Sequence, residues 1–149
     1  MAMRFIYLVA TLSCGPLLGC SDAPTESVTL YSLIENERPG HNMKEAFHDC
    51  LILGKTDVAS ASDRLAVIDA LQKGHLESDG TKYDCFIPRH GLRVRRNGTT
   101  TDYVISFDCL QMKKYFPNRR ETMSITASAK RVLDEYLKKA GIPQAEPPH

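Results

Sequence analysis

The five cysteines of this 149-residue chain are the side chains that could take part in the most kinds of chemistry. A cysteine thiolate can attack an electrophile, bind a metal ion or pair as a disulfide, depending on its neighbours and on the redox state of its compartment. Cys14 and Cys20 lie near the amino terminus, whereas Cys50, Cys85 and Cys109 lie further along. The chemistry open to each thiol therefore depends first on where the chain is delivered.

The amino-terminal segment has the order of a secretory signal peptide. Arg4 is followed by an apolar run over 5–12 and by small residues before Cys20. The span 5–19 would be about 22 Å long as a helix, shorter than the ~30 Å hydrocarbon core of a bilayer. A lasting transmembrane helix is therefore not expected. One interpretation of the segment is a plain signal peptide in which the cysteine at position 20 has no role of its own.

The four residues Leu17-Leu18-Gly19-Cys20 resemble the lipobox of bacterial lipoproteins. The resemblance implies that residues 1–19 are removed and that Cys20 receives a diacylglyceryl group and an acylated amine. Several acyl chains on one residue make a stable membrane anchor. Ser21 at the sorting position implies the outer membrane, periplasmic side, and the inner membrane stays possible because Asp22 follows.

After this processing three thiols remain, Cys50, Cys85 and Cys109. An odd number in an oxidising compartment indicates one disulfide and one leftover thiol, with three pairings possible. Cys85, His90 and Cys109 are also residue types that bind zinc or form a nucleophile with its base. The chain has no C-x-x-C pair, so we predict no metal site, no cofactor and no catalytic set. Three buried, unpaired thiols are the structural alternative.

Basic residues gather in one short stretch and form a candidate anion-binding patch. The members are Arg89, His90, Arg93, Arg95 and Arg96. Such a patch suits an anionic envelope polymer or another envelope protein, although charge that merely protects a sheet edge is the alternative. The whole chain has 19 basic and 18 acidic side chains. This balance argues against nucleic acid as a partner.

The pair Asn97-Gly98 is the strongest turn signal in the sequence. Both residue types tolerate the positive φ angles of a two-residue hairpin turn. We expect this turn to join a strand over 85–94 to a strand over 103–115. It would place Arg93 opposite Asp102, so that opposite charges pair across the hairpin.

The same register would set Cys85 opposite Leu110, one place away from Cys109. One extra residue at Gly91, accommodated as a β-bulge, would shift the far half of the hairpin and bring the two cysteines face to face. Of the three possible pairings we therefore predict the disulfide Cys85 to Cys109, together with a bulge at Gly91.

Hydrophobic periodicity and capping residues predict the remaining elements. These are strands over 28–34, 50–58 and 120–126, a helix from Ser60 or Ser62 to before Gly80, and a helix from Ser128 to Gly141. The fold class is α+β, a mainly antiparallel sheet of four or five strands packed against two helices. The predicted divisions are a signal peptide (1–19), a tether (20–27), one domain (28–142) and a disordered tail (143–149).

The stretch Cys85-Phe-Ile-Pro-Arg-His-Gly91, followed by Val104-Ile-Ser-Phe-Asp-Cys-Leu110, is similar to a family of small uncharacterised bacterial proteins, many with lipoprotein signals. The resemblance implies a recurring fold and transfers no catalytic role. We expect a lipid-anchored envelope protein that is a non-enzymatic binding or structural module. The alternative is a small envelope enzyme or a metal or thiol protein that uses Cys85, His90 and Cys109.

Overall fold

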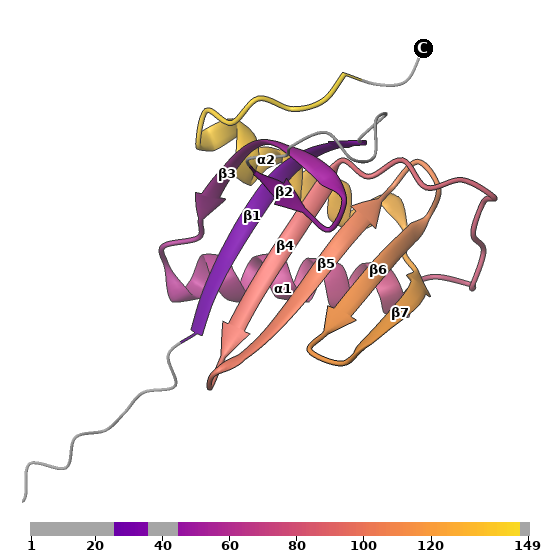
Figure 1. The fold of residues 1–149 in the computed structure, drawn as a ribbon, viewed down its shortest axis with the longest axis horizontal. Helices are drawn as coiled ribbons and strands as arrows, with labels where there is room; N and C mark the ends of the chain where they lie inside the picture. Colours follow the sequence, from indigo (N-terminus) through magenta and orange to yellow (C-terminus); the bar gives the residue numbers. More distant parts are fainter. Residues whose placement is uncertain (1–25, 36–44, 147–149) are drawn as a thin grey trace, which may run out of the picture.

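The computed structural model describes residues 26–35 and 45–146, which form one antiparallel sheet and two helices (Figure 1). The strands are β1 (Glu26–Glu35), β2 (Ala46–Phe47), β3 (Cys50–Asp57), β4 (His90–Arg96), β5 (Thr99–Ser106), β6 (Gln111–Phe116) and β7 (Arg119–Ser124). The helices are α1 (Ala61–Leu76) and α2 (Lys130–Lys139). The sheet order is β2-β3-β1-β4-β5-β6-β7. The predicted α+β class is confirmed, but the described residues form seven strands rather than four or five.

Two features account for the additional strands. The segment predicted as one strand over 103–115 is interrupted by a turn at 107–110, where Leu110 has a φ of 52°. The chain reverses there, so β6 pairs with β5 instead of continuing it. The two-residue strand β2 then adds a short edge beside β3. A leucine in the left-handed region is uncommon. The turn at 107–110 contains no glycine or asparagine, the residue types that usually signal a reversal, and for this reason the sequence analysis did not predict it.

The β4–β5 hairpin has the predicted turn and register. Asn97 and Gly98 have φ values of 51° and 76°, and Arg93 pairs with Asp102. The predicted bulge at Gly91 is wrong, because the register continues without a shift through Gly91 to His90. The chain leaves the regular ladder before His90 instead of bulging within it.

The disulfide between Cys85 and Cys109 is nevertheless confirmed, with the two Cα atoms 5.6 Å apart. An irregular segment before β4 brings Cys85 to the turn that follows β5. Its backbone is attached where Tyr83 N donates to Cys109 O over 3.1 Å and where Ile87 N donates to Ser106 Oγ over 3.0 Å. Side-chain and turn contacts therefore replace the ladder that the sequence predicted.

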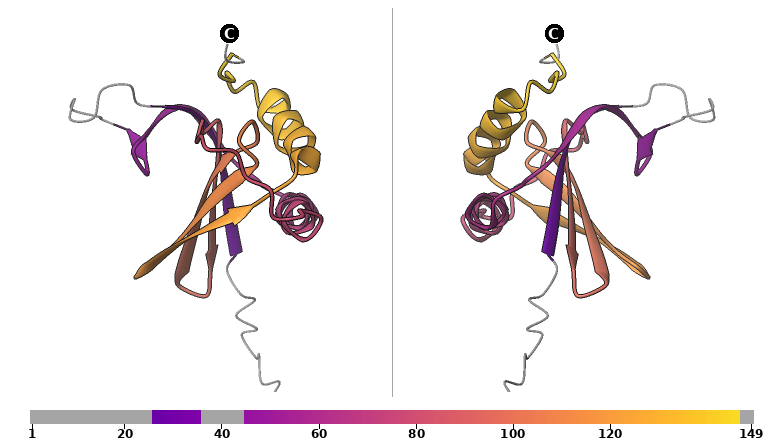
Figure 2. Two further views of the ribbon diagram at one scale, coloured as in Figure 1. Left: turned by 90° about the vertical axis from the view of Figure 1, so that its right-hand side faces the viewer. Right: turned by 90° about the vertical axis from the view of Figure 1, so that its left-hand side faces the viewer.

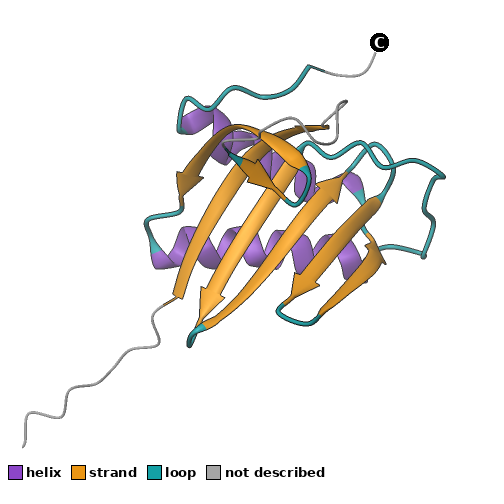
Figure 3. Cartoon of the chain, viewed as in Figure 1, coloured by secondary structure: helices purple, strands orange, loops and turns teal. Residues whose placement is uncertain are grey.

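Both helices lie on the same face of the sheet, behind it in Figure 3 and to one side of it in Figure 2. The buried core lies between these layers. Its fully buried side chains include Leu30, Leu92, Ile105, Val67, Leu133 and Leu137. Among the described residues, no helix is long and apolar enough to cross a bilayer.

The helix ends agree with the sequence except at one cap. Ser60 Oγ accepts from Asp63 N over 3.0 Å at the start of α1. The predicted cap Ser128 is wrong, because a 3-10 turn over 127–129 precedes α2 and the Ser128 hydroxyl donates to Glu77 instead. Gly141 ends the second helix with a φ of 69°, as predicted.

The two ends of the predicted domain are extended by a few described residues. β1 begins at Glu26, within the predicted tether 20–27. At the other end Gln144, in the predicted tail 143–149, donates to the backbone oxygen of Asp134 over 3.1 Å.

The other face of the sheet carries neither of the two described helices, and we call it the open face. β1 changes register between Ser32 and Leu33, and at this end β1 and β3 curve away from the helices. The curvature carries β2 out over the open face, where Phe47 is buried against it (Figure 2). We call the segment 45–50 the overhang. The overhang therefore covers one end of the open face, and Phe86 packs against the same cluster of side chains.

Candidate functional site

A row of polar side chains crosses the open face through six neighbouring strands. In register order the row is Asp57, Thr29, Arg93, Asp102, Tyr115 and Arg120. Side chains that are directly opposite one another in an antiparallel sheet point to the same face and touch. At one end, Thr29 Oγ1 donates to Asp57 Oδ1 over 2.6 Å.

The centre of the row is a two-bond ion pair between Arg93 and Asp102. Arg93 Nε and Nη2 donate to the two carboxylate oxygens over 2.8 and 2.7 Å. Burial raises the pKa of Asp102, but the hydrogen bonds from Arg93 and His48 outweigh it and hold the pKa below its ordinary value of 3.8. The carboxylate is therefore charged at neutral pH and holds the guanidinium in one orientation.

His48 reaches the same carboxylate from the overhang. Its turn between β2 and β3 places His48 and Asp49 at φ values of 49° and 67°. The imidazole stacks on the Tyr115 ring, with centroids 3.8 Å apart, and Nε2 lies 2.7 Å from Asp102 Oδ2. Because that carboxylate is ionised, Nε2–H is the donor. Sequence analysis missed His48 as a member of this site, although histidine and aspartate are among the non-glycine residues enriched at positive φ and so carried a weak turn signal.

Phe47 attaches the overhang to the sheet through ring contacts. It stacks on Tyr31 with centroids 4.3 Å apart, and the Arg93 guanidinium lies 5.3 Å from its centroid. A Cβ added to Gly91 would fall 2.8 Å from Phe47 Cε1. Only a glycine permits this approach of ring to backbone.

A hollow of about 240 Å³ lies where the overhang meets the open face. Its lining residues are Tyr31, Glu45, Ala46, Phe47, Ile52, Lys55 and Arg93. A second cation, Lys113, lies nearby with Nζ 3.6 Å from the centroid of the Phe86 ring, and burial lowers its pKa. Aromatic planes and oriented cations are thus combined on one surface.

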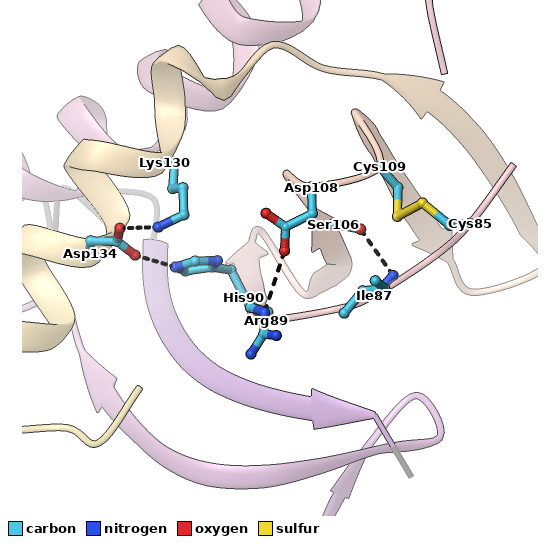
Figure 4. Close-up of polar contacts among 9 residues, drawn as sticks. All are labelled: Cys85, Ile87, Arg89, His90, Ser106, Asp108, Cys109, Lys130 and Asp134. Atoms are coloured by element: carbon cyan, nitrogen blue, oxygen red, sulfur yellow. Dashed lines mark hydrogen bonds and ion pairs between the residues drawn. A yellow bond between two sulfur atoms is a disulfide. The ribbon is translucent and has the colours of Figure 1, made fainter. Parts of the chain in front are cut away.

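The predicted anion-binding set does not lie on one surface, because neighbouring strand residues alternate between faces. Arg93 and Arg95 belong to the open face, where Arg95 is exposed. Arg96 pairs with Glu26 at the end of the sheet. Arg89 lies before the strand, with its Nε 3.4 Å from Asp108 Oδ2 (Figure 4).

His90, the fifth member of that set, is turned towards the helices and is 3% exposed. Its Nε2 lies 2.7 Å from Asp134 Oδ1, while Lys130 Nζ lies 2.6 Å from Asp134 Oδ2 (Figure 4). The three residues connect β4 to α2. In this position His90 connects two structural elements and is not open to a ligand.

The cysteines of the described residues offer little reactivity. The sulfurs of Cys85 and Cys109 are joined, so neither is a thiolate. Burial raises the pKa of the Cys50 thiol to about 11, which leaves it protonated at neutral pH. Residues 26–35 and 45–146 contain no group of three His, Cys, Asp or Glu side chains that could hold a metal ion. Cys20 lies outside the described residues.

The pair of Asp102 and His48 is the one arrangement with a catalytic appearance, because a carboxylate orients an imidazole in many general bases. Within the described segments, however, no serine, threonine or cysteine side chain is hydrogen-bonded to the His48 ring. The arrangement can hold a ligand through cations and rings, and it lacks an adjacent nucleophile among these residues.

Comparison with protein-family models, with curated proteins and with solved structures found no match to this chain.

Proposed function

We propose that this chain is a lipid-anchored envelope protein, held through Cys20, and that its domain is a binding module. Its ligand is an anionic envelope polymer or the acidic surface of another envelope protein, and its binding surface is the open face. On this proposal it lies on the periplasmic side of the outer membrane, with the inner membrane as the alternative. The lipobox at residues 17–20 is the support for the anchor.

The observation that carries the binding proposal is the orientation of Arg93 within the polar row. The bonds to Asp102 hold its guanidinium in place, and the Phe47 ring lies beside it. A cation that is already oriented loses less conformational freedom when an anion binds. Charges that only keep a surface soluble do not need hydrogen bonds and an aromatic ring to hold them in one orientation.

Cations on the open face also suit an anionic ligand. The strands contribute five of them, Lys55, Arg93, Arg95, Lys113 and Arg120, together with three carboxylates, Asp57, Asp102 and Glu35. The side chain of Asp102 is 7% exposed, and its charge is paired with Arg93. The overhang adds Glu45 beside the hollow. The charge of this face is therefore mixed, and an anion is bound by individual cations through charge-assisted hydrogen bonds rather than by a net positive surface.

The alternative is an envelope enzyme or metal or thiol protein that uses Cys85, His90 and Cys109. Such chemistry needs a free thiolate or an accessible imidazole. The disulfide and the buried position of His90 favour the binding module over this alternative.

Retention on isolated, lipid-extracted envelope material, together with cross-linking of the anchored form, tests the proposal. We expect the variant Lys55→Gln/Lys113→Gln to lose about tenfold in retention, because each lysine can make a charge-assisted bond to the ligand. The matched control is Lys138→Gln/Lys139→Gln, which removes two charges from exposed positions at the end of α2. Equal retention of the two variants would contradict a role for the open face.

A further inference from the structure

The start of β1 marks the end of the sheet that is nearest to the predicted anchor. In the register of β1 and β4, Glu26 pairs with Arg96 and Ser27 pairs with Arg95. The β4–β5 turn at 97–98 follows at once. Figure 1 shows this turn and the start of β1 together at the lower end of the sheet.

The β6–β7 turn lies at the same end. Tyr115 is level with Arg93 in the polar row, and β6 continues in the same direction as β4 to Phe116. The chain reverses at 117–118, and Arg119 and Arg120 follow (Figure 1). The two successive hairpins, β4–β5 and β6–β7, thus have their turns at the same end of the sheet.

Four arginines are gathered at this end by the two hairpins, and we call Arg95, Arg96, Arg119 and Arg120 the anchor-end arginines. All four residues are exposed. Arg96 contacts Glu26, and Arg119 lies 3.3 Å from Glu121. Exposed pairs of this kind are weak in water and exchange readily for other anions. The four cations therefore exceed the two carboxylates beside them.

The chain length between the lipid and the sheet places this end at the membrane. Six residue steps from Cys20 to Glu26 span at most about 22 Å when fully extended. The ten residues of β1 extend over a further ~33 Å. With Cys20 anchored, the anchor-end arginines are therefore much closer to the bilayer than the overhang is.

We infer that the anchor-end arginines bind the anionic headgroups of phospholipids beside the lipid anchor. A guanidinium matches a phosphate group with two parallel hydrogen bonds, and attraction to an anionic membrane surface acts over about one Debye length. Phe116 adds an aromatic ring at the same turn, with the Arg119 guanidinium 4.3 Å from its centroid. This inference rests on the proposed lipid anchor. It orients the strands away from the bilayer and leaves Lys55, Arg93 and Lys113 of the open face for the second ligand.

Hydrogen exchange of the acylated, full mature protein in vesicles tests the inference. Vesicles of phosphatidylcholine are compared with vesicles that also contain phosphatidylglycerol. We expect amides of 95–100, 116 and 118–121 to exchange at least about fivefold more slowly on the anionic vesicles, because one basic residue near an anionic surface favours binding by a factor of about five. Salt at ~1 M, where the Debye length is about 3 Å, should remove the difference.

Two charge-matched variants identify the surface responsible. Replacing all four anchor-end arginines by glutamine should abolish the protection. The control Lys73→Gln/Arg131→Gln/Lys138→Gln/Lys139→Gln removes the same charge from exposed helix positions and should retain it. Protection lost equally in both variants would overturn the inference.

The intact mass of the purified protein separates this inference from the proposed function. A protein without acyl chains on Cys20 would overturn both. An acylated protein whose hairpin amides exchange equally fast on neutral and anionic vesicles would overturn the headgroup contact and leave the anchored binding module standing.

Discussion

The ring of Phe47 occupies the space that a side chain at Gly91 would need. A Cβ on Gly91 would lie 2.8 Å from Cε1 and 2.9 Å from Cδ1 of the ring. The same ring stacks on Tyr31 and lies beside the Arg93 guanidinium. One glycine in β4 therefore permits the contact that holds the overhang on the open face.

We predict that Gly91→Ala destabilises the domain by ~1–3 kcal/mol, because the added methyl group forces Phe47 away from the sheet. The free energy of unfolding in denaturant measures the effect. In a Phe47→Ala background the same substitution should cost less, since the ring is gone and only Leu33 Cδ1, 3.0 Å from the added Cβ, still has to move. An equal cost in both backgrounds would show that the contact is unimportant.

Asp102→Asn tests the polar row through the pH dependence of stability. The pKa of Asp102 is lower in the folded state than its ordinary value of 3.8, so the carboxylate stabilises the fold above about pH 4 and this stabilisation is lost as the pH falls through the folded pKa. The variant should lose ~1–3 kcal/mol at pH 7 and show a flatter decline in acid. Unfolding measured between pH 2 and pH 7 checks this expectation.

The matched control for that substitution is Asp69→Asn, on an exposed position of α1. It should keep both the stability at pH 7 and the acid decline of the parent protein. A parallel decline for Asp102→Asn would mean that the row does not contribute to acid sensitivity.

Removing the disulfide should destabilise the domain without unfolding its sheet. The bridge closes a sequence separation of 24 residues, and its loss costs about 3 kcal/mol by chain entropy. The double variant Cys85→Ser/Cys109→Ser should show this loss and should no longer respond to reductant. Denaturant unfolding of both proteins, with and without reductant, gives the comparison; a parent protein indifferent to reductant would contradict the prediction.

Thiol counting gives a prediction that joins the structure to the proposed anchor. Cys50 is buried and its pKa is raised to about 11, so a thiol reagent should not modify the native protein at neutral pH. After denaturation without reductant, the envelope-purified protein should show one reactive thiol, that of Cys50. Two thiols would mean that Cys20 carries no lipid.

Local signals in the sequence were sufficient for much of the fold. The Asn97-Gly98 turn determined the β4–β5 register, and with it the pairing of Arg93 with Asp102. Ser60 and Gly141 marked helix ends correctly. These features depend on neighbouring residues alone, where backbone preference and a single hydrogen bond decide the outcome.

The candidate site was less predictable, because its members come from distant segments. Arg93 was expected at an anion-binding patch, whereas His48 was missed and His90 was assigned to a patch that it does not join. Alternation along β4 separates Arg93 from His90, and no property of the isolated stretch 89–96 shows which face the helices cover.

The sequence by itself determined the fold class and the tight hairpin, and it carries the expectation of a lipidated Cys20. The cysteine pairing was predicted correctly, but through a bulge at Gly91 that the structure does not have. Only the tertiary structure decided that Leu110 reverses the chain, that Phe47 lies on Gly91 and that the β4–β5 and β6–β7 turns lie at the same end of the sheet as the start of β1. Local preferences act between near neighbours in the chain. The curvature of a sheet and the choice of its covered face depend instead on packing among all of its strands.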